Sequence, residues 1–120
     1  MATGLQGLTL YAAAAGEDLS NYLFHFIMVH TDGTLKHAAV NSEVIGSLIE
    51  TATIGNPASV QCDGIGKIVL GATLNAGVTI MPNTNGDGTA VAATGSPPGT
   101  NAGILLVGGN SGETVTYLIK

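Results

Sequence analysis

One short stretch of the chain carries the residue types of a calcium-binding loop. Oxygen-bearing side chains stand at alternate positions, on Asn83, Asn85 and Asp87, and Gly88 follows at the sixth position. A complete loop closes with a bidentate glutamate at its twelfth position, which Thr94 occupies here. With one carboxylate and no closing ligand, the stretch is better interpreted as a turn. Asn and Gly suit a turn because both tolerate left-handed backbone conformations. We therefore predict a hairpin that joins residues 77–82 to residues 89–94, without a metal ion.

The three histidines are the other candidate metal ligands. A two-residue turn at Asp32–Gly33 would place His30 and His37 on one face as diagonal neighbours, with Cα atoms roughly 7–8 Å apart. His25 would face the other way, because five residues is an odd step along a strand. Two imidazoles fall short of the three protein ligands usual in a catalytic zinc site, so we predict no metal. Cys62 is the only cysteine, which excludes an intrachain disulfide, and we interpret it as a small core residue.

Two further patterns could suggest catalysis. Gly64, Gly66 and Lys67 resemble part of a phosphate loop, but Gln61 stands where the Walker motif needs a glycine, and we expect a bulged hairpin instead. The adjacent carboxylates at Glu17-Asp18 are typical of a solvated turn, and no Gly-x-Ser-x-Gly elbow is present. We therefore predict no catalytic residues, no cofactor and no enzymatic activity.

Composition restricts the partners that the chain can have. Hydrophobic residues make up 45% of the 120 residues and charged residues only 9%, against about 25% in ordinary soluble domains. A surface so poor in charge indicates that other subunits cover part of it. The net charge of −5, with three lysines and no arginine, argues against nucleic-acid binding. No apolar run reaches the roughly 18 residues of a membrane span.

Alternation of apolar and polar residues predicts an all-β fold, a small sandwich or barrel of about nine short strands. The clearest strand, residues 22–31, has two apolar faces and should be central. The expected strands are 22–31, 34–39, 43–50, 58–64, 67–72, 77–82, 89–94, 103–108 and 114–120. The alanine-rich stretch 11–19 should form at most one helical turn. Residues 1–10 are expected to be an extended N-terminal arm, and residues 11–120 a single β domain.

The order of these turns and strands resembles the small capsid decoration (cement) proteins of tailed bacteriophages. Residues 15–38, "AGEDLSNYLFHFIMVHTDGTLKHA", are similar to that family's opening turn and strand, and "GILLVGGNSGETVTYLIK" is similar to its usual ending. The likeness extends over roughly residues 11–120. The chain departs from the family pattern at Val78, where an acidic residue is common, and in the proline-rich loop "TGSPPGTN".

The resemblance implies a structural protein of the virion, located on the outer surface of the capsid. It would bind the major capsid protein, stabilise contacts between capsid subunits and associate as a homotrimer. From their position in the expected arm, Thr3, Leu5, Leu8 and Leu10 are our candidate capsid-binding residues.

Two other functions stay open. The first is a receptor- or carbohydrate-binding module of a phage fibre or spike, although sugar sites usually need aromatic platforms and the chain has no tryptophan. The second is a hydrolase or metal enzyme, which bound zinc would support.

Overall fold

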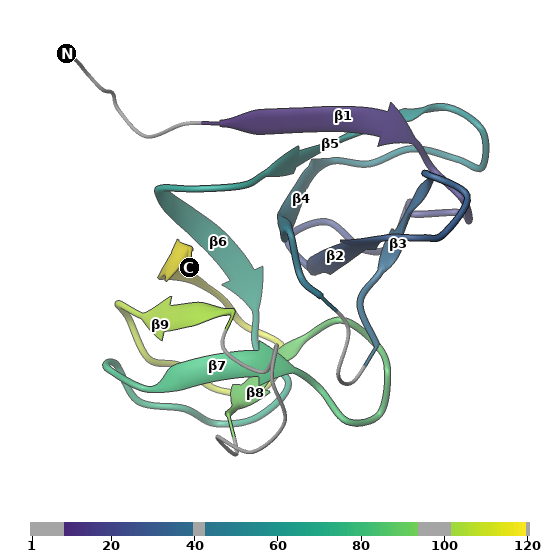
Figure 1. Ribbon diagram of the computed structural model, residues 1–120. Helices are drawn as coiled ribbons and strands as arrows, with labels where there is room; N and C mark the ends of the chain where they lie inside the picture. The colour runs from purple at the N-terminus through teal and green to yellow at the C-terminus, as the bar shows by residue number, and fades with distance from the viewer. Residues whose placement is uncertain (1–8, 40–42, 94–101, 120) are drawn as a thin grey trace, which may run out of the picture.

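The computed structural model describes residues 9–39, 43–93 and 102–119, which form two antiparallel five-stranded sheets (Figure 1). The first sheet has the order β1-β5-β4-β2-β3 and the second the order β6-β10-β9-β7-β8. The strands of the first sheet are β1 (Leu10–Ala14), β2 (Phe26–Val29), β3 (Leu35–His37), β4 (Gly46–Glu50) and β5 (Pro57–Gln61). Those of the second sheet are β6 (Ile65–Val69), β7 (Thr79–Pro82), β8 (Ala90–Ala92), β9 (Gly103–Leu105) and β10 (Thr114–Ile119). The all-β prediction is confirmed, with ten strands rather than nine, and neither sheet closes into a barrel over the described residues.

The additional strand is β1, which lies in the alanine-rich stretch that was expected to contain at most one helical turn. Leu10–Ala14 pairs antiparallel with β5, so that Tyr11 lies opposite Val60. The sequence analysis expected no strand here, but a run this short gains more from edge pairing than from an isolated helical turn. In the described part of the chain, no helix has the length and apolarity needed to cross a membrane.

The strand predicted at residues 22–31 is shorter than expected. Phe24 has a φ of 60°, a conformation that ends an extended segment, and β2 begins only at Phe26. The prediction that this strand is covered on both faces is confirmed at the start of β2 but not at its end, where Val29 is exposed. Phe26 and its neighbour Ile27 are both fully buried, and they belong to two different hydrophobic cores.

The hairpin after β2 has a different register from the predicted one. The His30 N–H donates to the Thr34 carbonyl and the Gly33 N–H to the His30 carbonyl, each at 2.8 Å. The loop therefore contains three residues, and Gly33 occupies a left-handed conformation with a φ of 86°. The extra residue places Ile27, rather than Met28, opposite His37.

Two hydrophobic cores lie on opposite faces of the first sheet. We call the face that carries Ile27, Leu35, Leu48 and Val60 its inner face, and the opposite face its outer face. The inner face belongs to the first core. The outer face contributes Phe26 and other residues to the second core. The buried members of this second core are Phe26, Ala38, Ile68, Leu70, Ile80, Ala90, Ala102, Leu105, Val115, Tyr117 and Ile119.

The two sheets are copies of one topology. Each sheet places its fifth strand beside its first, then its fourth, second and third strands. In each, a single parallel bridge joins the residue after the first strand to the third strand, Ala15 to Leu35 and Leu70 to Ala90. The structure therefore contains two equivalent halves in tandem, one built on β1 to β5 and the other on β6 to β10.

Local geometry repeats as well. In both halves an Asp-Gly-Thr turn precedes the third strand, and the aspartate accepts hydrogen bonds from the threonine N–H and hydroxyl. In both halves a positive-φ glycine donates its N–H to the residue that forms the parallel bridge. Equivalent residues of the first and second halves are Ala15 and Leu70, Leu19 and Leu74, Asp32 and Asp87, Leu35 and Ala90, Gly46 and Gly103, Gly55 and Gly112, and Val60 and Tyr117.

The two halves pack against each other through different faces of their sheets. The outer face of the first sheet lies against the inner face of the second, the face that carries Ile80, Ala90, Leu105 and Tyr117. The Phe26 ring meets the Tyr117 ring edge-on, with ring centroids 5.9 Å apart. Burial raises the pKa of the Tyr117 hydroxyl to about 12, as expected of a phenol deep in this interface.

Gly46 and Gly103, at equivalent positions, make the closest backbone approaches. A Cβ atom on Gly46 would lie 1.9 Å from the Gln61 carbonyl oxygen, and one on Gly103 would lie 2.3 Å from the Leu118 carbonyl oxygen. We predict that Gly46→Ala and Gly103→Ala each lower the free energy of unfolding by roughly 3 kcal/mol or more, or prevent folding. Gly33→Ala, with a φ of 86° but nothing within 4 Å, is the control and should cost about 1 kcal/mol. Chemical denaturation compares them, and equal losses would contradict the close approach.

Candidate functional site

The stretch from Asn83 to Gly88 is the loop of a hairpin, as predicted. Pro82 at the end of β7 pairs with Ala90 at the start of β8. The side-chain oxygens of the loop bind its own backbone. Asn85 Oδ1 accepts the Asp87 N–H at 3.0 Å, and Asp87 Oδ1 accepts the Thr89 N–H at 3.0 Å. The oxygens that could coordinate calcium therefore serve to fix the turn.

Asp87 is held in its charged form by these contacts. Partial burial acts to raise its pKa, but hydrogen bonds from Thr89 and Asn85, together with nearby His25, outweigh this effect and lower the pKa below its usual value. Exposed Asp32, the equivalent residue of the first half, has a pKa lowered to about 2, chiefly by the hydroxyl and N–H of Thr34.

The predicted meeting of His30 and His37 does not occur. With the three-residue hairpin loop, His37 shares the inner face with Ile27, while His30 lies on the alternate face beside Asp32, with Nδ1 3.2 Å from Oδ1. The histidines that do approach each other are His25 and His37. In the described ranges, no three His, Cys, Asp or Glu side chains form a group that could hold a metal ion.

His25 and His37 belong to a small polar cluster around Tyr22. The Tyr22 ring stacks on His37 with centroids 4.3 Å apart and meets His25 edge-on at 5.3 Å. The Glu17 carboxylate accepts the His37 N–H at 2.8 Å and also contacts the His37 ring Nδ1. Glu17 is thus half-buried and paired, contrary to the prediction that both neighbouring carboxylates are solvated. Only exposed Asp18 fits that expectation, where it accepts the Ser20 N–H.

This cluster joins the two halves. Phe26, which follows His25, donates its N–H to the Gly88 carbonyl at 2.8 Å. A Cβ atom on Gly88 would lie 3.4 Å from the Cβ atoms of both His25 and His37. The hairpin loop of the second half therefore rests on the histidines, and we interpret the cluster as part of the junction between the halves.

The segment expected to form a bulged hairpin around Gly64 and Gly66 has a different structure. β5 and β6 do not pair with each other, and they lie in different sheets. Gly64, with a φ of 81°, lies where the chain crosses from the first half to the second. The Lys67 ammonium lies 5.8 Å from the centre of the Phe24 ring.

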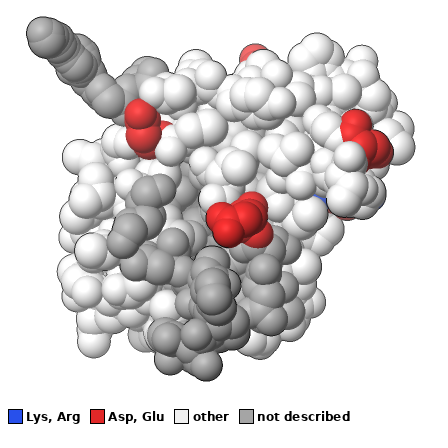
Figure 2. Space-filling model, viewed as in Figure 1, with Lys and Arg blue, Asp and Glu red and all other residues white. Residues whose placement is uncertain are grey.

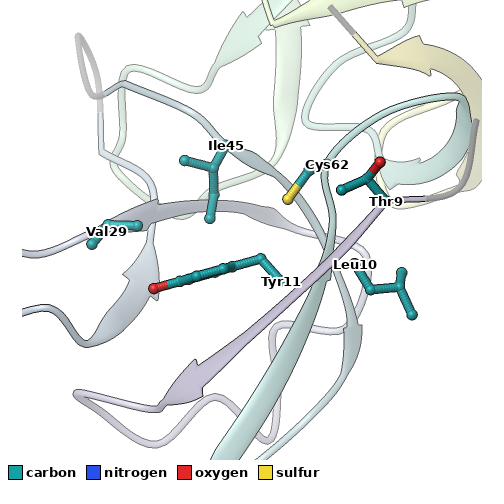
Figure 3. A pocket seen from close by; sticks show the side chains of 6 residues that line it. All are labelled: Thr9, Leu10, Tyr11, Val29, Ile45 and Cys62. Atoms are coloured by element: carbon teal, nitrogen blue, oxygen red, sulfur yellow. The ribbon is translucent and has the colours of Figure 1, made fainter.

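A groove lies on the inner side of the first sheet. Its volume is about 470 Å³ and its lining is mostly apolar (Figure 3). The side chains in Figure 3 come from β1 and the residue before it, from β2, and from the segments before β4 and after β5. The Tyr11 ring lies along the groove towards Val29. The groove is lined by Thr9, Leu10, Tyr11, Val29, Ile45 and Cys62. Sequence analysis missed it because these residues come from four separate segments.

Cys62 is half-buried: it packs against the first core, in keeping with its interpretation as a core residue, and it also lines the groove. Partial burial raises the pKa of the Cys62 thiol, and the negative charge of Asp63 raises this pKa further. Asp63 also holds the start of the described chain, because its carboxylate accepts the Thr9 N–H and hydroxyl, each at 2.7 Å. These two hydrogen bonds therefore fix Thr9 in place at the rim of the groove.

The predicted capsid-binding residues are only partly within the described chain. Thr3, Leu5 and Leu8 lie outside the described residues. Leu10 is the first residue of β1, and its side chain is 51% exposed.

A second apolar surface lies on the outer face of the second sheet. Leu118 of β10 pairs with Ile65 of β6 on one side and with Ile104 of β9 on the other. All three side chains are exposed. Charges are sparse on the face shown in Figure 2, where acidic side chains form separate spots and only a small area of a basic side chain is visible.

No protein-family model matches the chain, and no curated protein matches it. Among solved structures, the chain is similar to the N base of head fibre gp8.5 of bacteriophage phi29. The TM-score is 0.74, 19% of the residues are identical, and the match covers 94% of each chain. At this level of identity the likeness establishes a shared fold.

The hairpin loop generates a test of the metal question. A hydrogen-bonded carboxylate with a lowered pKa stabilises the fold only while it is ionised. In the wild type, the stability that Asp87 contributes is therefore present above about pH 4 and is lost as the pH falls further. Asp87→Asn should remove this contribution. We expect the difference in melting temperature between wild type and Asp87→Asn to shrink between about pH 5 and pH 3.

Excess EDTA should leave both melting temperatures unchanged at pH 7. A marked drop for wild type in EDTA, restored by calcium, would contradict the turn interpretation.

Proposed function

We propose that this protein is a structural component of a bacteriophage virion, a decoration (cement) protein on the outer surface of the head. In this role it binds the major capsid protein and stabilises contacts between capsid subunits. The observation that carries the proposal is the fold shared with the N base of a phage head fibre, over 94% of both chains.

The surface suits repeated binding to a protein shell. Few charged groups would have to lose water on contact, and large apolar side chains are already exposed. Weak contacts repeated over many copies on one shell add up to strong retention. Self-association as a homotrimer is part of the same proposal.

The start of the chain is the proposed contact with the shell. β1 lies at the edge of its sheet, and an edge strand can accept a strand from a partner. Leu10 presents an exposed side chain there, and Thr3, Leu5 and Leu8 precede it. The proposal includes no catalytic role.

A sugar-binding module is the weaker alternative. Tyr117 is fully buried and Tyr22 is engaged with two histidines. Of the tyrosines, this leaves Tyr11, on the rim of the groove, as an exposed ring for stacking on a sugar.

Sedimentation with purified heads that lack the protein tests the proposal. Wild type should pellet with the heads and saturate. Deletion of residues 2–8 and Leu10→Asp should each weaken binding about tenfold or more, since both remove apolar contact at the start of the chain. The control is Ile54→Asp, which alters a 68% exposed side chain in the loop between β4 and β5 and should bind like wild type.

The outcomes separate the two parts of the proposal. Failure of wild type to bind the heads would reject the decoration role. Wild-type binding that survives both N-terminal changes, with melting temperatures unaltered, would reject only the assignment of the contact to the start of the chain.

A further inference from the structure

The contact between the two halves provides an internal example of how this fold covers its surfaces. Phe26, Ala38 and Ser47 on the outer face of the first sheet are fully buried. They lie against the inner face of the second sheet, where a Cβ atom on Gly66 would be 3.3 Å from Ser47 Oγ. One half thus covers the outer face of the half before it in the chain.

Among the described residues, nothing covers the outer face of the second sheet in the same way. Its row of Ile65, Leu118 and Ile104 is 62%, 45% and 39% exposed, and Leu106 beyond β9 is also exposed. The equivalent row of the first sheet is Leu10, Gln61 and Ser47, where the two latter residues are buried. The covered row therefore carries polar side chains at two positions where the uncovered row carries Leu and Ile. Such an inversion indicates that the apolar row is covered in the functional state.

The groove of the first half is equivalent to part of the inner face of the second sheet. In the second half, that face packs against the outer face of the first sheet. Matching hydrogen bonds establish the equivalence, since Cys62 N–H donates to the Thr9 carbonyl and Ile119 N–H to the Gly64 carbonyl. The groove residues Tyr11, Val29, Ile45 and Cys62 correspond to Gly66, Pro82, Ala102 and Ile119 of the second half. These four residues of the second half are buried, whereas Tyr11 and Val29 in the groove are 43% and 41% exposed.

Over the part of the chain that the structure describes, each molecule thus leaves one outer face and one groove uncovered. We propose that the outer face of the second sheet of one molecule, centred on Leu118, docks on the groove of the first half of the next molecule. The occupant of the groove is a second copy of this chain, because the chain already packs its own halves with these two surfaces. The contact is head-to-tail, so its repetition gives a closed ring or an open chain of subunits. It goes beyond the proposed function because it requires no capsid.

Two variants that each break one surface provide the test. Leu118→Asp places a charge on the outer face and leaves the groove intact, while Tyr11→Asp alters the groove and leaves the outer face intact. Both side chains are partly exposed, so both variants should fold, which circular dichroism verifies. Ile54→Asp, on an exposed loop away from both surfaces, is the control.

Sedimentation equilibrium then measures the mass. Wild type and Ile54→Asp should form species larger than 11.9 kDa, while each surface variant alone should remain at 11.9 kDa. An equimolar mixture of the two variants should form a 1:1 dimer and nothing larger. One intact outer face and one intact groove permit a single contact. A mixture that stays monomeric, or wild type that stays monomeric up to about 1 mM, would overturn the proposal.

Cys62 reports on the groove directly. With Cys62→Ser added to the Tyr11→Asp variant, the only thiol in the mixture lies in the intact groove of the Leu118→Asp copy. Its reaction with a thiol reagent should slow about tenfold once nine-tenths of the grooves are occupied. If this thiol is instead protected in the isolated Leu118→Asp variant and released by deletion of residues 2–8, the chain's own N-terminal segment fills the groove. That result would overturn the proposal.

Discussion

The packing of one half against the other is the interaction on which the rest of this structure depends. Phe26 and Tyr117 meet edge-on between the sheets, and both are fully buried. Burial of a large aromatic side chain contributes about 1.5–3 kcal/mol, and an edge-to-face pair adds to this. The same interface orders the hairpin loop of the second half, because Gly88 accepts a hydrogen bond from Phe26 and rests on two histidines. Without this contact, the apolar inner face of the second sheet and the Phe26 ring of the first would lie in water.

Because the two halves pack against each other through different faces, the two ends of the molecule expose different surfaces. The first half keeps an open groove, and the second keeps an apolar outer row. A protein of this composition has few charges with which to keep such surfaces apart from other molecules. We propose that these two surfaces serve the function of the protein, in a structural role within a repeated assembly.

The sequence predicted the all-β fold and most strands because alternation and glycine-rich turns are local signals. It failed for β1, where alanine favours neither strand nor exposure, and pairing with β5 decides the outcome. It also misplaced the hairpin register, because Asp32–Gly33 suits both a two-residue turn and the observed three-residue loop. That single residue changed which histidines meet.

The repeat and the groove could not be found from local patterns. The two halves share backbone geometry and a few turn residues, such as Asp-Gly-Thr at 32–34 and 87–89, while equivalent core positions differ in size, as with Val60 and Tyr117. The groove residues are brought together only by sheet order. The calcium-like loop was interpreted correctly as a turn because its missing closing carboxylate is a local feature.

The most direct measurement of the central claim is a pair of three-dimensional reconstructions of the same phage heads, imaged by electron cryomicroscopy with and without the purified protein. The account predicts additional density on the outer surface that fits the two-sheet fold, with the start of β1 directed towards the shell. Heads whose outer surface is identical in the two reconstructions would contradict it.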